Sequence, residues 1–217
     1  MDREVSASVA VPQYALVARG LTVRRGERLL FEGLDFEVGA GDVLLLRGAN
    51  GVGKSTLLLA LAGIVHPDAG TVAYRADGVA AEAGPETHLL TYQSGIKSRL
   101  TVTENLTFWR DINGPSGLSV HHALLEVGIG GLGELEAGYL SSGQTRRLAL
   151  ARLLASNRKI WLLDEPTATL DADGEALLGQ LIDRHRERGG ITVIATHHDV
   201  PLRVAAGIET LILGGTA

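Results

Sequence analysis

The sequence contains no cysteine, so disulfide bonds and thiolate metal sites are excluded. Basic residues are outnumbered: 20 Lys and Arg stand against 25 Asp and Glu, a formal net charge of −5. Without a basic excess to neutralise phosphates, we expect no nucleic-acid partner. Long hydrophobic runs are also missing, because the longest, residues 57–65, falls far short of the ~20 residues that a helical membrane crossing needs. We therefore expect no direct membrane insertion, and the N-terminus lacks the continuous apolar segment of a signal peptide.

One short stretch carries a phosphate-binding pattern. Residues 48–56 fit G-x-x-x-x-G-K-[ST], with an apolar run at 43–46 before them and another at 57–62 after them. A strand therefore delivers the loop and a helix leaves it, which is the context that the motif requires. The alternative, a Gly-rich turn with a surface lysine, would match by accident in about one chain in a hundred of this size. We predict a nucleotide-binding loop made of Gly48, Ala49, Asn50, Gly51, Val52, Gly53, Lys54, Ser55 and Thr56.

Each residue type in this loop has a physical role. The glycines let the backbone curl until its N–H groups point at one centre, a concavity that binds anions. The helix that begins near Gly53 adds the positive end of its dipole. Lys54 would reach the β- and γ-phosphates, and the Ser55 hydroxyl would take one position on Mg²⁺. The predicted ligands are thus ATP and Mg²⁺.

The whole chain, residues 1–217, is predicted to form one α/β domain. Residues 14–19 and 28–38 predict an antiparallel sheet ahead of the loop. Strands at 160–163 and 191–195, separated by an amphipathic helix at 173–188, predict a mostly parallel sheet covered on both faces. Between them, roughly 94–158 is helical with Gly-rich breaks, and we interpret it as a helical subdomain inserted into the core.

Two further segments carry possible chemistry. The strand at 160–163 ends in Asp164 and Glu165, and strand ends are where ligands sit in α/β sheets. Asp164 could hold Mg²⁺ and Glu165 could act as general base on an attacking water, although a solvated acidic turn is the alternative. Residues 140–144 precede a helix with apolar Leu148, Ala151 and Leu154 on one side and arginines on the others. Ser141 and Gln144 form a possible capping box, and a capped helix N-terminus can also receive a phosphate.

These motifs resemble the ATP-binding-cassette ATPases. The phosphate loop, Gln93, Leu-Ser-x-Gly-Gln at 140–144, Leu-Leu-Asp-Glu-Pro-Thr at 162–167 and Thr196-His197 occur in the family's order and span nearly the whole chain. The resemblance implies two such domains that sandwich two ATP molecules. In it Gln93 contacts Mg²⁺ and the attacking water, His197 contacts the γ-phosphate, and each ATP meets Ser141, Gly143 and Gln144 of the second copy. Asp171 closes a segment, 168–171, that communicates across the dimer.

The resemblance also implies partners and a location. A member of this family works with membrane-spanning transporter subunits, which places it in the cytoplasm, peripherally on the cytoplasmic face of the inner membrane. Two positions depart from the pattern. Ser142 stands where most members have glycine, and Arg25 stands where an aromatic residue usually stacks on adenine. Arg25 can still lie on the base through its guanidinium plane; alternatively it points to solvent and Phe31 or Tyr14 covers the base.

A narrower resemblance comes from residues 92–106. The strings Gln-x-Gly-Ile-Lys at 93–97 and Glu-Asn-Leu at 104–106 resemble the ATPase subunits of bacterial haem exporters used in cytochrome c maturation. We therefore predict an ATP-hydrolysing subunit that energises haem export. The alternatives are the ATPase of another transporter, a soluble cassette ATPase without a transport role, and a nucleotide-gated module without useful hydrolysis, which Glu165 and His197 argue against.

Overall fold

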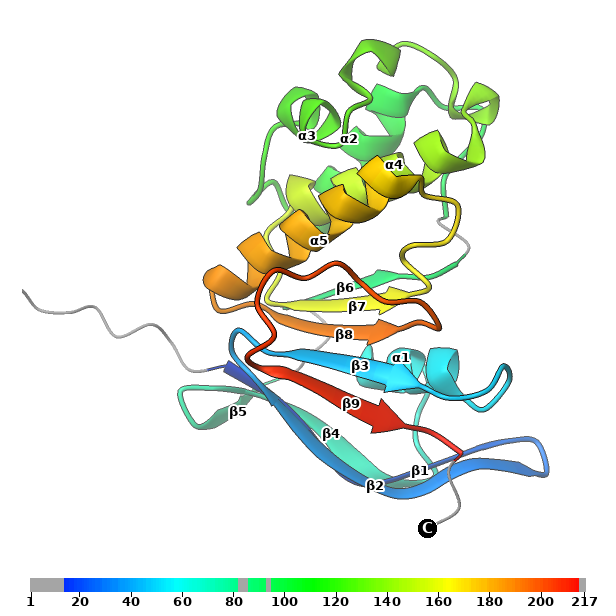
Figure 1. The fold of residues 1–217 in the computed structure, drawn as a ribbon, viewed down its shortest axis with the longest axis vertical. Coiled ribbons are helices and arrows are strands. Elements are labelled where there is room, and N and C mark those ends of the chain that lie inside the picture. Colours follow the sequence, from blue (N-terminus) through cyan, green and yellow to red (C-terminus); the bar gives the residue numbers. More distant parts are fainter. Residues whose placement is uncertain (1–13, 82–85, 93–94, 215–217) are drawn as a thin grey trace, which may run out of the picture.

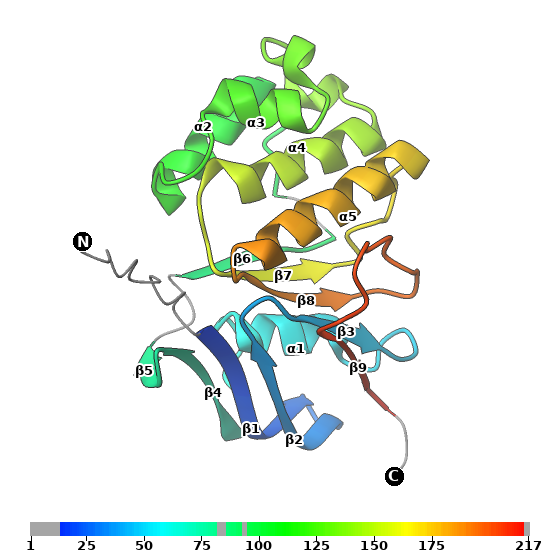
Figure 2. The same ribbon diagram turned by 60° about the vertical axis from the view of Figure 1, so that its left-hand side comes forward.

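The structure is a computed structural model that describes residues 14–81, 86–92 and 95–214. Within these ranges the chain forms two sheets and five α-helices (Figure 1). The two sheets lie against each other, and most of the helices gather on the far side of the second sheet (Figure 2). This arrangement is the predicted α/β class with an antiparallel sheet next to a parallel one.

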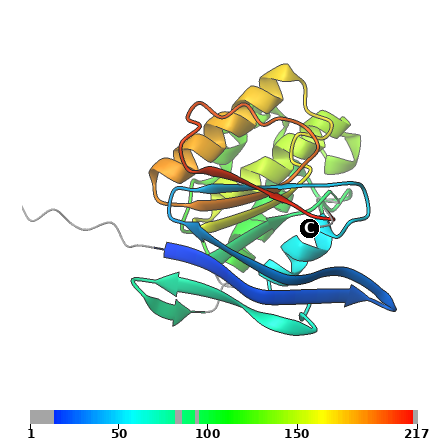
Figure 3. The same ribbon diagram turned by 60° about the horizontal axis from the view of Figure 1, so that its bottom comes forward.

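The first sheet is antiparallel, as residues 14–38 predicted. Its strand order is β2-β1-β4-β5, formed by β1 (Tyr14–Arg25), β2 (Arg28–Gly39), β4 (Ala69–Ala76) and β5 (Val79–Ala81). The strand predicted to end at 19 continues through register shifts to Arg25, which pairs with Arg28 across the turn. Figure 3 shows this long hairpin from below, running beneath the parallel sheet. The turn that joins β1 to β2 is therefore flanked by two exposed arginines, Arg25 and Arg28.

The second sheet is parallel throughout its described pairs. Its order is β6-β7-β8-β3-β9, formed by β6 (Thr87–Leu90), β7 (Ile160–Asp164), β8 (Ile191–Ala195), β3 (Val43–Arg47) and β9 (Ile208–Ile212). The sequence predicts β3, β7 and β8 from the apolar runs at 43–46, 160–163 and 191–195, and β6 from a short strand pattern at 88–92. It does not predict β9. As an edge strand, β9 needs no apolar run on both faces, and most of its side chains are half-buried or exposed.

Alternate residues of the parallel strands serve two different cores. On β7, Ile160 and Leu162 pack with α1 (Lys54–Leu61) and the antiparallel sheet. Trp161 and Leu163 pack on the other face with α4 (Ser142–Ala155) and α5 (Ala172–Glu187). Because successive side chains of a strand point to opposite faces, a strand covered on both sides must be apolar at every position. This is why the run at 160–163 could be recognised without alternation.

The remaining helices gather at the end of the molecule away from the antiparallel sheet (Figures 1 and 2). They are α2 (Val102–Asn113), α3 (Val120–Glu126) and two short 3₁₀ turns, Gly130–Leu132 and Ala137–Tyr139, packed with α4. The predicted Gly-rich breaks at 114–117 and 128–133 fall between α-helices, and the second contains the 3₁₀ turn Gly130–Leu132. Among the described helices, none combines the length and the apolar character that a membrane crossing requires. The limits of an inserted subdomain at 94 and 158 stay a prediction.

Candidate nucleotide-binding site

The phosphate loop connects β3 to α1, the strand–loop–helix context that the motif required. Two of its glycines are needed for shape. Gly48 has φ of 141°, and a Cβ there would lie 2.5 Å from the carbonyl oxygen of Leu213. Gly53, the residue before α1, has φ of 115° and its Cβ would lie 3.2 Å from Leu30. Any side chain at these positions would strain the loop, because L-residues rarely adopt positive φ.

Lys54 lies inside the loop that it terminates. Its side chain is 7% exposed, and its ammonium donates to the carbonyl oxygens of Gly48 (2.9 Å) and Ala49 (3.1 Å). The third contact is with His197 Nε2 at 2.9 Å, 143 residues away in sequence. Since an ammonium can only donate, this Nε2 accepts and the imidazole carries its proton on Nδ1. The first-turn N–H groups of α1 have no partner within the helix, so the helix begins, next to the phosphate loop, with donors that it does not itself bond.

The two acids stand at the end of β7, beside the loop. Asp164 is 8% exposed, and burial raises the pKa of its carboxyl, opposed by a hydrogen bond with the Ser55 hydroxyl. Glu165 takes a positive φ of 43°, and its N–H donates to the Ala195 carbonyl on β8. Its Oε1 lies 3.7 Å from His197 Nε2. The sheet thus joins residues from three distant segments, because the carboxyl ends of parallel strands share one edge.

One residue that the sequence did not single out holds this arrangement in place. Arg146, near the start of α4, is 4% exposed and donates to the carbonyl oxygens of Thr91 (3.1 Å), Asp164 (3.0 Å), Glu165 and Pro166 (3.0 Å). Burial lowers its pKa, and the neighbouring carboxylates oppose that shift. The helical pattern had placed the arginines of this helix away from the apolar side. This guanidinium is compatible with burial, because each of its three nitrogens donates to a carbonyl.

The phosphate loop and the two acids line one cavity of about 410 Å³, which we call the nucleotide cavity. Its described lining consists of Arg25, Arg28, Leu30, Asn50, Gly51, Gly53, Lys54, Ser55, Thr56, Tyr92, Asp164 and Glu165. Arg28 and Tyr92 were not anticipated. The β1–β2 hairpin could have indicated Arg28, because it is the partner of Arg25 across the turn. Gln93 lies outside the described residues.

The lining also bears on the two interpretations of Arg25. Arg25 borders the nucleotide cavity, whereas the two proposed substitutes are engaged elsewhere among the described residues. Tyr14 stacks on Tyr74 with ring centroids 5.6 Å apart, and Phe31 is 6% exposed, packed under Gly53. Arg25 is thus better placed than either aromatic ring to meet a base.

The segment at 141–144 begins α4, and the predicted capping box is present. Ser141 Oγ accepts from the Gln144 N–H, and Gln144 Oε1 accepts from the Ser141 N–H. Ser141, Gly143 and Gln144 are not among the described residues lining the nucleotide cavity of their own chain. Asp171 caps α5 and pairs with Arg147 at 3.1 Å. The hydrogen bond from the Gly174 N–H, with the Arg147 contact, lowers the pKa of Asp171.

Comparison with known proteins defines the class first. Residues 31–168 match the ABC transporter family. A putative ABC transporter ATP-binding protein of Pyrococcus furiosus has the same fold, with a TM-score of 0.77 at 24% identity over 92% of this chain and 97% of that one. The fold and the composition of the nucleotide cavity are therefore those of an ATP-binding cassette.

Sequence relatives narrow the class. The chain is 46% identical to a cytochrome c biogenesis ATP-binding export protein CcmA of Rhizobium johnstonii, over 87% of this chain and 90% of the relative. It is 42% identical to the CcmA protein of Agrobacterium fabrum, over 90% and 98%. The chain belongs to the ABC transporter family and, within it, to the family of these CcmA export proteins. Membership confirms the predicted ATP-binding cassette and its ATP-hydrolysing activity.

Proposed function

We propose that this protein hydrolyses ATP to energise a membrane complex that exports haem for cytochrome c maturation. The observation that carries the proposal is the nucleotide cavity, which is lined by a phosphate loop and two acids from distant segments. His197 contacts one lining residue, Lys54, at 2.9 Å and lies 3.7 Å from another, Glu165. The cytochrome c branch of the proposal rests on the names of the relatives. Haem as the cargo rests on the strings at 93–97 and 104–106 that resemble haem-exporter ATPases.

The phosphate loop and Lys54 bind the phosphates. The N–H groups of Gly51, Gly53 and the first turn of α1 offer a concave set of donors to phosphate oxygens. Phosphate oxygens would replace the loop carbonyls and His197 as acceptors for the Lys54 ammonium. A buried ammonium interacts strongly with the anion because little water screens the pair.

The residues present suit Mg²⁺. This ion prefers hard oxygen ligands and is commonly held by one or two protein groups together with substrate phosphates. Ser55 and Asp164 already lie within hydrogen-bond reach of each other, and Gln93 would be the third protein ligand. In the described part of the chain no cluster of three acids or histidines forms a complete metal cage. When bound, Mg²⁺ would neutralise charge on the β- and γ-phosphates.

Glu165 and His197 act on the reacting end. Glu165 accepts a proton from the water that attacks the γ-phosphate, the role of a positioned general base. His197 exchanges its contact with Lys54 for one with the γ-phosphate. The Arg146 bonds hold the backbone on both sides of Glu165, so its carboxylate is oriented before the substrate arrives. Such pre-organisation supplies a large part of the catalysis in phosphoryl transfer.

A second copy of the chain completes each site. Ser141, Gly143, Gln144 and Asp171 line no part of their own nucleotide cavity. The first three form the N-terminus of α4, which is exposed or partly exposed, has no acid in its first turn and is suited to phosphate. In a head-to-tail dimer this N-terminus would face the ATP bound to the partner, and Asp171 would lie in the segment that communicates across the dimer. ATP binding would then close the dimer and hydrolysis would open it.

Residues 93–105 contact the membrane subunits, and this contact holds the protein on the cytoplasmic face of the membrane. Asn105 is 1% exposed and ties this segment down, accepting from the Lys97 N–H and donating to carbonyls of Lys97, Leu100 and Thr101. The Lys97 side chain stays on the surface, over the Phe108 ring at 5.0 Å. Lys97→Glu should weaken co-purification with the membrane subunits while the isolated chain keeps its basal ATPase activity.

The function is tested in a bacterium whose own gene for the CcmA relative is deleted. Expression of this chain should restore covalent haem attachment to c-type cytochromes, measured by haem staining, and Glu165→Gln should not. An active ATPase that fails to restore haem attachment would favour the alternative of another transporter. Activity without any membrane partner on co-purification would favour a cassette ATPase with no role in transport.

A further inference from the structure

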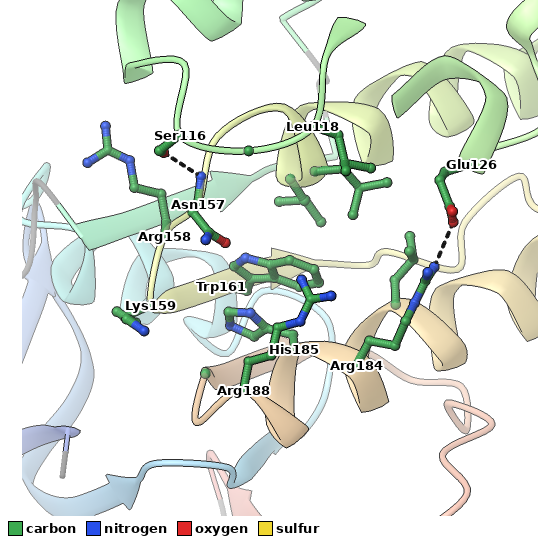
Figure 4. A pocket seen from close by; sticks show the side chains of 15 residues that line it. Ser116, Leu118, Glu126, Asn157, Arg158, Lys159, Trp161, Arg184, His185 and Arg188 are labelled. Atoms are coloured by element: carbon green, nitrogen blue, oxygen red, sulfur yellow. Dashed lines mark hydrogen bonds and ion pairs between the residues drawn. The ribbon is translucent and has the colours of Figure 1, made fainter. Parts of the chain in front are cut away.

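A second cavity lies at the other end of the parallel strands. Its volume is about 440 Å³, and it is bordered by Lys159 and Trp161 where β7 begins and by Gly190 just before β8. The loop at 116–118 and the last turns of α4 and α5 complete it. We call it the basic cavity, and Figure 4 shows it from close by. It shares no described lining residue with the nucleotide cavity.

Positive charge dominates the basic cavity. Arg158, Lys159, Arg184 and Arg188 line it, against one acid among its described residues, Glu126. That acid is already paired with Arg184 at 2.9 Å. Four cations against one carboxylate leave an excess of three positive charges, in a chain whose formal net charge is −5. Guanidinium groups bind carboxylates and phosphates through paired N–H donors, so an anion is the complementary ligand.

A buried donor in the wall points to the same ligand. Trp161 is 4% exposed, and its Nε1–H has no hydrogen-bond partner among the described residues. Figure 4 shows the nitrogen edge of the indole on the side of Asn157 and Arg158. A buried N–H without an acceptor is unfavourable, because it has lost its hydrogen bond to water and gained none in return. An anionic oxygen in the basic cavity would supply the missing acceptor.

The rest of the wall is apolar. The Trp161 ring stacks on His185 with centroids 3.9 Å apart and an interplanar angle of 8°. Burial lowers the pKa of His185 to about 4, so this imidazole is neutral at pH 7 and adds no charge. Leu118, Leu153, Leu154 and Leu181 complete the apolar surface. An inorganic ion would leave these side chains without a partner, whereas a ligand with an apolar body would cover them.

We propose that the basic cavity binds a small organic anion that carries carboxylate or phosphate oxygens on an apolar body. The oxygens contact Arg188 and accept from Trp161 Nε1, and the body packs on the leucines. The Lys159 ammonium, which lies over the Tyr14 ring at 4.9 Å, adds positive charge to the same wall. Because the basic cavity joins the helical part to β7 and α5, such a ligand also ties these two parts of the molecule together.

Fluorescence of Trp161 tests the proposal. The chain has two tryptophans, so Trp109→Phe leaves Trp161 as the sole reporter. Benzene-1,3,5-tricarboxylate and phenyl phosphate are the probes for the two oxygen chemistries, and sulfate is the anion without an apolar body. We expect a saturable change with at least one organic probe and binding of sulfate at least tenfold weaker. No saturable change up to about 10 mM probe, or equal binding of sulfate, overturns the proposal.

Charge reversal locates the site. Arg188→Glu should weaken the organic probe at least tenfold, whereas Arg75→Glu, an exposed charge reversal on β4, should not. Lys159→Gln is a second, milder variant, and thermal melting shows that each variant is folded. Calorimetric titration of the wild-type chain should give the same dissociation constant. Unchanged binding in both Arg188→Glu and Lys159→Gln contradicts the assignment. Since no readout involves ATP turnover, failure here leaves the proposed ATPase function untouched.

Discussion

The two cavities are nearly equal in volume, about 410 and 440 Å³, but they are built in different ways. The nucleotide cavity takes half of its described lining from one continuous stretch, residues 50–56, and its ligand chemistry can be read from that stretch. The basic cavity collects runs of at most three residues from a loop and from the ends of helices and strands between 116 and 190. A local motif therefore predicts the nucleotide cavity, whereas no pattern in the linear sequence predicts the basic cavity.

The chemistry of the two walls also differs. The nucleotide cavity combines three cations with Asp164 and Glu165, so it can hold a metal and move a proton. The basic cavity has a single carboxylate, which already pairs with Arg184, and its histidine is buried and neutral. An excess of positive charge, with the one carboxylate paired and the histidine ring stacked on Trp161, suits binding and not catalysis. The following predictions test this contrast, from the largest expected effect to the smallest.

Loss of the general base should have the largest effect. Glu165→Gln keeps the size of the side chain but removes its ability to accept a proton, so hydrolysis should slow by roughly 10²–10⁴-fold while ATP binding persists. Turnover assays together with nucleotide titration measure both quantities. Asp173→Asn, an exposed acid at the start of α5, is the matched control and should keep wild-type turnover. Near-normal turnover in Glu165→Gln would sink the assignment.

Arg146 should affect the rate of hydrolysis by positioning the backbone around Glu165. A lysine there cannot reach the four carbonyls that the guanidinium bridges, so the backbone around Glu165 should shift. A displacement of about 1 Å typically costs about 10²-fold in rate. We expect Arg146→Lys to lower kcat about that much with little change in KM for ATP, because Arg146 does not line the nucleotide cavity. Arg99→Lys, on the surface, is the control. A rise in KM with unchanged kcat would show that Arg146 serves binding instead.

Acid should destabilise the region of the basic cavity. Burial lowers the pKa values of both His88 and His185 to about 4, below the usual 6.5. The unfolded chain therefore binds protons between pH 6.5 and 4 that the folded chain does not. The stability that the neutral rings contribute is complete above pH 6.5 and is lost as the pH falls. Between pH 7 and 5 the loss should be about 2 kcal/mol per histidine.

Denaturant unfolding at the two pH values measures this loss. His185→Phe should remove its share of the pH dependence while keeping a ring against Trp161. His121→Phe, at an exposed position on α3, should leave the dependence unchanged. Identical pH profiles for His185→Phe and the wild type would contradict the attribution.

The base end of the nucleotide cavity should show the smallest effect. Arginine offers adenine a guanidinium plane but no broad apolar wall, and cation–π contacts contribute roughly 0.5–2 kcal/mol. The preference for ATP over GTP should then be under about tenfold, or ~1.4 kcal/mol. Arg25→Tyr should tighten ATP binding with little change in maximal turnover, and Arg24→Tyr, one residue outside the lining, should not. A strong ATP preference in the wild type, with no gain in Arg25→Tyr, would reject this account.

The sequence alone determined the phosphate loop, the acids at the end of β7, the capping box at Ser141 and most strands of both sheets. These features are set by neighbours in the chain: glycine at fixed spacing, apolar runs of strand length, and a hydroxyl three residues before an amide. Their physics acts over a few residues, so a linear pattern suffices to predict them.

Only the tertiary structure decided the rest. Arg146 and Arg147 are adjacent and look alike in the sequence. Yet Arg146 is buried and donates to four carbonyls at or just after the ends of β6 and β7, whereas Arg147 forms an ion pair with the exposed Asp171. The exposed edge strand β9 and the basic cavity had no local signal either. In each case the environment comes from segments tens of residues apart, and burial, hydrogen-bond acceptors and pKa values exist only once those segments have packed together.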